Sequence, residues 1–290
     1  MGHGGYRVAL GGMAALVLAA LIALAAPTAG AAADLRIEGT AGDAALTADV
    51  RAVLGDVLRV YETKVAAQPP LGAKPIVVCQ APDGEPRACL DRLPREYQIN
   101  LTNLFARFYS QQVYQFGHEL AHVWADPRRS NWFVESVATT MSLVSLSELA
   151  EKWETQPPRP AWKDYAKPFR AYREDTIKGH LEKLGLSSND AVREWAKAGL
   201  VDLVREGKVG RDAQHACALL IEEALGNHPK AWGAITSLGA ATTDGRTDLA
   251  KWKTLAKPEE RPLVDDLAET FGPALEARPE KAAEAAKPEK

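Results

Sequence analysis

The sequence predicts an α+β protein, in which a small N-terminal β-sheet is followed by a mainly α-helical C-terminal part. Two short segments before residue 103 have the composition of strands, and the apolar residues after it recur mostly at helical spacing. Glycines and prolines separate these helical segments. Hydrophobic residues make up 46% of the 290 residues and charged residues 25%, which is sufficient for a sizeable core.

The first expected element is a helix over residues 46–66. Its apolar residues recur every three or four positions, and Thr47 or Asp43 can cap its N-terminus. Pro69 and Pro70 end it.

Two expected strands follow this helix. Residues 75–79 form a short, β-branched segment bounded by turn residues, and residues 97–102 alternate with period two. We expect both segments to belong to the N-terminal sheet.

The helical part begins with a long apolar segment, residues 105–125, which Asp126 and Pro127 end. A second helix over residues 132–153 has Asn131 or Ser130 as its cap. A proline-rich segment then breaks the chain. The periodicity predicts further helices at about 187–206, 211–226, 228–238 and 262–271.

The N-terminal segment 1–33 has the order of a secretory signal, with Arg7, an apolar run from Val8 to Ala26, and alanines before a cleavage site. The alternative is an uncleaved membrane anchor, because the run of roughly 19 residues is close to the ~20 that span a bilayer. Its many alanines and glycines favour the signal. In both cases the rest of the chain would be secreted, periplasmic or extracellular, with membrane attachment only through an uncleaved segment.

The remaining chain divides into residues 34–155, which carry the chemistry discussed below, and a helical region 156–275. Residues 276–290 consist almost wholly of alanine, glutamate, lysine and proline, so we expect a disordered charged tail. The net charge is -3 and there is no basic stripe, which argues against nucleic acid as a partner. The oligomeric state has no signature in the sequence.

The cysteines fit an oxidising compartment. Cys79 and Cys89 flank a segment rich in turn residues and can close it as a disulfide, or they are two unrelated thiols. Cys217 lies in an apolar helical stretch, where we expect a buried thiol without a reactive role.

The sequence His118-Glu119-Leu120-Ala121-His122 lies inside the predicted helix 105–125. Histidines four residues apart lie on one helical face, so both imidazoles can reach one metal ion. Glu119 can then act as general base on a water at the open position of the metal. This pattern predicts a zinc-dependent hydrolase; the alternative is a pair of ordinary helical histidines.

A catalytic zinc needs a third protein ligand. Asp126 lies eight residues after His118, about 12 Å along the helix axis, which is too far to share the ion. Glu135 lies in the first turn of the next helix and can face the histidines, although it can also be a charge that stabilises the helix N-terminus. Glu148 and Glu151 are weaker candidates, because they lie several turns farther along the same helix. Ala125 and Arg128 stand where metzincins have glycine and histidine, which excludes that class.

The motif at 118–122, followed by Trp132-Phe133-Val134-Glu135-Ser136-Val137-Ala138, resembles the gluzincin-type zinc metallopeptidases, in particular compact secreted members of bacterial type. The resemblance implies an active-site helix and a glutamate helix. It implies His118, His122 and Glu135 as zinc ligands and Glu119 as general base for peptide hydrolysis. It also implies that residues 97–102 form the sheet edge beside the cleft. Ser136 departs from the family, where glycine is commoner.

Gluzincins often use a tyrosine or histidine to stabilise the oxyanion, and Tyr165, Tyr172 and His180 are the candidates downstream. We expect structural roles for His215 and His228. The leading expectation is a zinc metallopeptidase acting on peptide or protein substrates. Two alternatives remain open: a zinc-stabilised or degenerate gluzincin-like binding or scaffold protein at the cell surface, and a hydrolase of a non-peptide amide.

Overall fold

The computed structural model describes Met1 and residues 34–39, 43–243 and 245–277, and all statements below concern these residues. The predicted signal segment 1–33, apart from Met1, and the predicted tail beyond residue 277 lie outside them. Within the described ranges, no helix combines the length and apolar character that crossing a membrane requires.

Among the described residues, four short strands form a mixed sheet in the order β1-β2-β4-β3. β1 (Leu35–Ile37), β2 (Ile76–Gln80) and β4 (Tyr97–Leu101) run parallel, and β3 (Arg87–Cys89) is antiparallel to β4. Helix α1 (Ala44–Lys64) connects β1 to β2, and Asp43 caps it by accepting from the backbone N–H of Leu46. The predicted strands at 75–79 and 97–102 and the predicted first helix are therefore confirmed.

The sheet edge differs from the expectation. Residues 97–102 were expected at the edge, but β4 is an inner strand because the chain after β2 turns back and pairs β3 against it, with Ala88 opposite Ile99. β3 was missed because its sequence, Arg-Ala-Cys, follows a segment of prolines and glycine and contains no β-branched residue.

The expected disulfide is also absent from the fold. Cys79 pairs with Asn100 and Cys89 with Gln98, so β4 separates the two cysteines. Two strand spacings of about 4.8 Å place their Cα atoms on the order of 10 Å apart, beyond the reach of a disulfide. Both thiols are free, whereas Cys217 is buried as expected.

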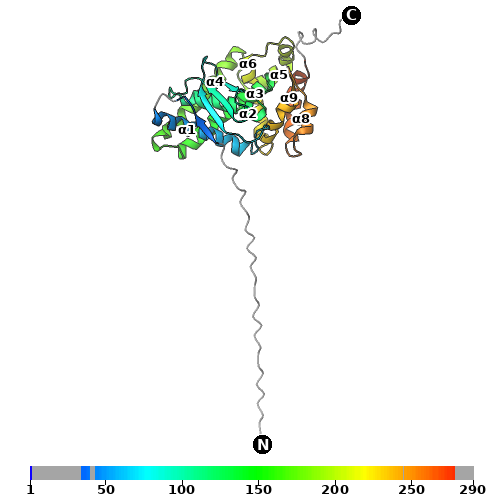
Figure 1. Cartoon of the computed structure of the whole chain (residues 1–290). Coiled ribbons are helices and arrows are strands. Elements are labelled where there is room, and N and C mark those ends of the chain that lie inside the picture. Colours follow the sequence, from blue (N-terminus) through cyan, green and yellow to red (C-terminus); the bar gives the residue numbers. More distant parts are fainter. Residues whose placement is uncertain (2–33, 40–42, 244, 278–290) are drawn as a thin grey trace. The chain divides into compact units, whose positions relative to one another are not determined.

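Helix α2 (Tyr109–Ala125) and helix α3 (Trp132–Thr155) form an antiparallel pair beside the sheet (Figure 1). α2 begins four residues later than predicted, because residues 105–107 are in turn conformation and Arg107 has a positive φ of 56°. α3 is buried along most of its length and lies at the centre of the molecule's helical part.

The remaining helices are α4 (Ala166–Lys183), α5 (Asn189–Arg205), α6 (Arg211–Asn227), α7 (Ile235–Ala241), α8 (Leu249–Leu255) and α9 (Arg261–Glu276), with 3₁₀ turns at Pro160–Tyr165 and Trp232–Ala234 and a short hairpin of β5 (Thr242–Thr243) and β6 (Arg246–Thr247). Of these helices, α4 and α6 pack against α3, and the others pack on neighbouring helices. Helices α4 and α8 were not predicted. α4 buries only Ala166, Phe169 and Leu181, so its sequence has almost no apolar face.

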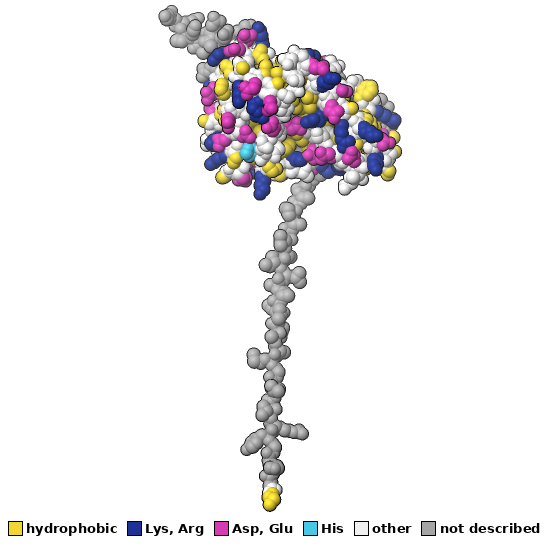
Figure 2. Space-filling view, turned by 180° about the vertical axis from the view of Figure 1, so that it is seen from behind, with side chains coloured by type: hydrophobic (Ala, Val, Ile, Leu, Met, Phe, Trp, Pro, Cys, Tyr) yellow, Lys and Arg dark blue, Asp and Glu magenta, His cyan; other side chains and the backbone are white. Residues whose placement is uncertain are grey.

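One hydrophobic cluster runs from Ile37 to Leu275, so the regions 34–155 and 156–275 contribute to a common core. The buried hydroxyl of Thr140 on α3, for example, donates to the carbonyl of Ala218 on α6. The α+β class with a small sheet and a helical majority is confirmed. On the face in Figure 2, basic and acidic side chains are interspersed, without a single-sign patch.

Candidate metal centre

The α2–α3 pair brings His118, His122 and Glu135 together. The Nε2 atom of His118 lies 3.2 Å from Oε2 of Glu135, and Nε2 of His122 lies 3.5 Å from Oε1. One ligand atom from each of the three side chains lies within 4.8 Å of the other two. The sequence-based candidates for metal ligands thus meet at one point.

The turn between the helices sets this arrangement. Asp126 ends α2 with a positive φ of 87° and forms an ion pair with Arg128, 2.6 Å between Oδ2 and Nη2. Asn131 then caps α3 by accepting from the backbone N–H groups of Phe133 and Val134. Asp126 is therefore engaged in the turn and lies outside the ligand cluster, as helix geometry predicted.

Charge and burial at the cluster favour a cation. The side chains are partly exposed, at 20% for His118, 12% for His122 and 32% for Glu135. Burial acts to raise the pKa of Glu135, but the two imidazoles outweigh it and hold that pKa far below its usual range. Burial acts to lower the pKa of His122, and Glu135 and Glu119 outweigh it, so that pKa is raised. Two imidazoles and one carboxylate form a donor set that zinc takes in catalytic sites.

Glu135 has a further partner outside the histidine pair. The hydroxyl of Ser130, in the turn before α3, donates to its Oε1 atom at 2.5 Å. Such a bond fixes the orientation of a ligating carboxylate. Glu148, a weaker candidate in the sequence, instead forms an ion pair with Lys64 and lies outside the cluster.

Glu119 is 5% exposed and points toward the sheet edge. Its Oε2 atom accepts a hydrogen bond of 2.7 Å from the backbone N–H of Ala88 on β3. Since Glu119 follows His118 directly and β3 lines the same cleft, its carboxylate lies between the histidine pair and the strand edge. This position suits a group that exchanges a proton with a water or a substrate beside the metal ligands.

A cleft of about 840 Å³ opens over these residues. Its walls are the segment 84–88 with the start of β3, one face of α4, and the first turn of α6. Of the three candidates for oxyanion stabilisation, Tyr172 and His180 line the cleft. Tyr165 does not line it: its ring packs against Trp153 and Phe169 in the aromatic core.

His180 is held by a carboxylate. Its Nδ1 atom lies 2.6 Å from Oδ1 of Asp212, while its ring stacks on His215 at 3.6 Å between centroids. Within the described residues, its Nε2 atom has no hydrogen-bond partner. His180 is therefore a candidate for a donor to a developing negative charge through Nε2 when the ring is an imidazolium, in which both ring nitrogens carry a proton.

The sequence did not single out Tyr114 or Asp212 as cleft residues, and it assigned His215 a structural role. The hydroxyl of Tyr114 lies 2.8 Å from Nε2 of His215, and Nδ1 of His215 lies 2.7 Å from the carbonyl of Arg211. Since a carbonyl only accepts, Nδ1 carries the proton and Tyr114 donates to Nε2. One signal was available: Tyr114 precedes His118 by one helical turn on the same face.

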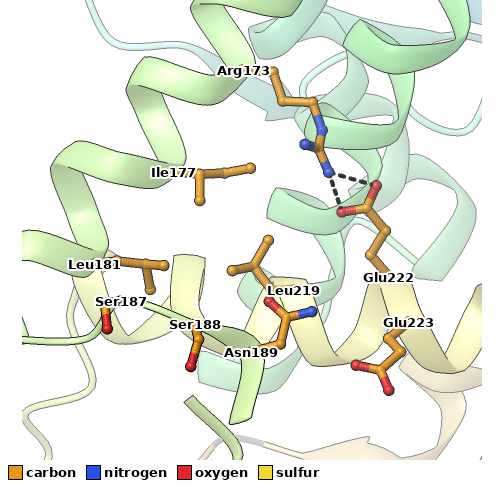
Figure 3. Close-up of a pocket in the computed structure, with 9 residues that line it drawn as sticks. All are labelled: Arg173, Ile177, Leu181, Ser187, Ser188, Asn189, Leu219, Glu222 and Glu223. Atoms are coloured by element: carbon orange, nitrogen blue, oxygen red, sulfur yellow. Dashed lines mark hydrogen bonds and ion pairs between the residues drawn. The ribbon is translucent and has the colours of Figure 1, made fainter. Parts of the chain in front are cut away.

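Another hollow, of about 520 Å³, lies between α4, α6 and the start of α5 (Figure 3). Among the residues that line it, the one arginine, Arg173, forms an ion pair with Glu222, with Nη2 at 2.9 and 2.7 Å from the two carboxylate oxygens. No group of three or more metal-ligating side chains other than His118, His122 and Glu135 was found among the described residues.

No protein-family model, curated protein or solved structure matches the chain. The assignment of a function therefore depends on the geometry and chemistry of the cleft.

Proposed function

We propose that the chain is a zinc-dependent metallopeptidase of the gluzincin type, with His118, His122 and Glu135 as metal ligands. The observation that supports this most directly is the meeting of the three ligand atoms within 4.8 Å of one another. A zinc ion held there would polarise the substrate carbonyl and lower the pKa of a water.

Glu119 is the proposed general base. One carboxylate oxygen is held by the N–H of Ala88, which orients the group and leaves the other oxygen to take a proton from water and pass it to the leaving amine. His180, oriented by Asp212, is the proposed donor to the developing oxyanion, acting as an imidazolium whose Nδ1–H donates to Asp212 and whose Nε2–H is directed to the substrate.

The position of β3 supports a peptide as substrate. β3 is an outer strand of the described sheet, and its residues Arg87 and Ala88 line the cleft. An extended peptide can add to such an edge through main-chain hydrogen bonds, here beside the N–H of Ala88, which already donates to Glu119. The scissile carbonyl would then lie beside the metal ligands and Glu119.

The test combines metal content with hydrolysis of a mixed library of unmodified peptides. Purified protein should hold about one zinc per chain, and His118→Ala and Glu135→Ala should lose most of it. Glu119→Gln should keep zinc and lose hydrolysis, while His180→Ala should lower kcat with little change in KM. Full hydrolysis by Glu119→Gln would remove Glu119 from the mechanism, and zinc bound without any peptide cleavage would instead favour a binding protein.

A further inference from the structure

One end of the cleft is positively charged. Lys183 and Arg211 both line it. Lys183 has a counter-charge, because its Nζ lies 3.3 Å from Oδ1 of Asp212, and the cleft residue Arg87 forms an ion pair with Asp83. The guanidinium of Arg211 has no ion-pair or hydrogen-bond partner among the described residues.

Asp212 does not neutralise Arg211, although it is the next residue. Consecutive side chains on a helix point in different directions, and the Asp212 carboxylate is directed to His180 and Lys183 on α4. Arg211 is also the first residue of α6, where Gly210 provides no side-chain cap. The free N–H groups and dipole of this helix end add to the positive potential of the guanidinium.

Arg211 is connected to the proposed metal centre through short contacts. Its carbonyl accepts from His215, which contacts the hydroxyl of Tyr114, one helical turn before His118 on α2. The positive charge of Arg211 acts on that hydroxyl, opposing the rise in the pKa of Tyr114 that burial causes. Arg211 to His215 on α6 and Tyr114 to His118 on α2 are each steps of four residues, about 6 Å along a helix axis. Arg211 and the metal ligands line the same cleft, and a separation of this order is spanned by a few residues of an extended peptide at ~3.3 Å per residue.

The charge of the cleft changes along α4. Asp175 lines the cleft eight residues before Lys183, about 12 Å along the helix axis. Within the described residues, Asp175 has no ion-pair partner. A substrate with a negative group would therefore be oriented with that group toward Lys183 and Arg211 and away from Asp175.

We propose that Arg211 binds a carboxylate of the substrate, so that the protein selects peptides with a free C-terminus or an acidic side chain a few residues from the cleaved bond. The proposal rests on the proposed function for the position of that bond. A guanidinium recognises a carboxylate through two parallel hydrogen bonds, for which an unpaired arginine is suited. Arg173 in the other hollow is not suited to bind a substrate carboxylate in this way, because its guanidinium already forms an ion pair with the carboxylate of Glu222 (Figure 3).

The test is equilibrium binding to zinc-loaded Glu119→Gln protein, which separates recognition from cleavage. The probes are four dansyl-labelled octapeptides of alanine and glycine: one with a free C-terminus, one amidated, one amidated with a central glutamate, and one amidated with a central glutamine. Binding of each peptide is measured by fluorescence anisotropy with three zinc-loaded proteins: the Glu119→Gln variant itself, and the same variant that also carries Arg211→Gln or Arg211→Lys. The control is Arg51→Gln, since Arg51 is an exposed arginine on α1, away from the cleft.

The expected result is that a carboxylate-bearing peptide binds about tenfold more tightly than its neutral counterpart, and that Arg211→Gln removes this difference. Arg211→Lys should keep part of it, and Arg51→Gln all of it. Preference for the free C-terminus identifies a terminal carboxylate as the recognised group, and preference for the central glutamate identifies a side chain. Equal binding of all four peptides, or a preference that survives Arg211→Gln, would overturn the proposal. If the peptides with a carboxylate bind more tightly but the wild-type protein, with Glu119 intact, cleaves no peptide, the proposed peptidase activity would be refuted and the recognition of a carboxylate by Arg211 would still hold.

Discussion

Gly117 on α2 packs directly against Ser145 on α3. A Cβ atom at Gly117 would lie 2.9 Å from Oγ of Ser145 and 3.2 Å from the backbone oxygen of Met141. The absence of a side chain at Gly117 therefore allows the two helices to approach closely, one residue before His118. This approach brings Glu135 within reach of both histidines.

We expect Gly117→Ala to lower both stability and zinc affinity. In an open helix this substitution gains about 1 kcal/mol, but overpacking at a tight helix contact costs about 1–3 kcal/mol. α2 must move away from α3, which separates the histidines from Glu135. Thermal unfolding and zinc titration measure the two effects.

The matched control is Gly226→Ala on α6, where a Cβ would meet no atom within 4 Å. That variant should unfold at the wild-type temperature or above it and bind zinc normally. If Gly117→Ala behaves like Gly226→Ala, close packing at Gly117 does not position the metal ligands.

The Ser130–Glu135 hydrogen bond predicts a second effect on metal binding. Ser130→Ala removes the donor to Oε1 of Glu135, so the carboxylate loses one constraint on its orientation. Loss of such an outer partner weakens metal binding by about 10- to 100-fold. Competition with a zinc-binding dye measures the affinity. Ser187→Ala, at an exposed serine near the start of α5, should leave it unchanged. An unaltered affinity in Ser130→Ala would show that Glu135 does not depend on this bond.

The elements that carry the proposed site were predictable from the sequence, because they have strong local signals. The HExxH spacing and the apolar periodicity around it predicted α2, and Asn131 followed by an apolar segment predicted the start of α3. The turn at Asp126–Pro127 predicted that the two helices would pair. Glu135 was therefore identifiable before its distance from the histidines was known.

The walls of the cleft were less predictable, because they consist of elements with weak local signals. α4 buries few apolar residues, and its polar face, including Tyr172 and His180, is visible only once the helix is placed against α3 and α6. β3 depends on long-range pairing with β4 rather than on its own sequence. No sequence motif surrounds Arg211, so its position in the cleft could be seen only in the folded structure.

The separation of Cys79 from Cys89 by β4 predicts three free thiols. Burial raises the pKa of each, to about 12 for Cys217. We expect alkylation of the unfolded, unreduced protein to label all three cysteines, and a disulfide between Cys79 and Cys89 would leave only Cys217 labelled. Mass spectrometry distinguishes the two results.

Native protein adds a kinetic distinction between these thiols. Cys217 is fully buried, whereas Cys79 on β2 and Cys89 on the outer strand β3 are partly exposed. Alkylation of the native protein at about pH 8 should therefore reach Cys79 and Cys89 first and Cys217 only after unfolding. Rapid native labelling of Cys217 would contradict the packing of α6 against α3.

His215 predicts an acid-dependent loss of stability. Burial lowers its pKa to about 4 in the folded protein, and neighbouring His180 and His118 act in the same direction. In the unfolded chain a histidine has a pKa of about 6.5, so between these values the unfolded state binds a proton that the folded state does not. Stability therefore falls as the pH decreases from about 6.5 to about 4, by up to about 3 kcal/mol from this residue.

Replacing His215 with glutamine removes this proton and should reduce the loss of stability on acidification. Urea unfolding at about pH 8 and about pH 4.5, with a chelator present so that metal release does not contribute, measures the difference. Tyr114→Phe is the control, because it deletes the hydrogen bond to Nε2 but keeps a buried imidazole, and it should retain most of the acid dependence. If His215→Gln loses as much stability on acidification as the wild-type protein, the imidazole of His215 is not held neutral by the fold.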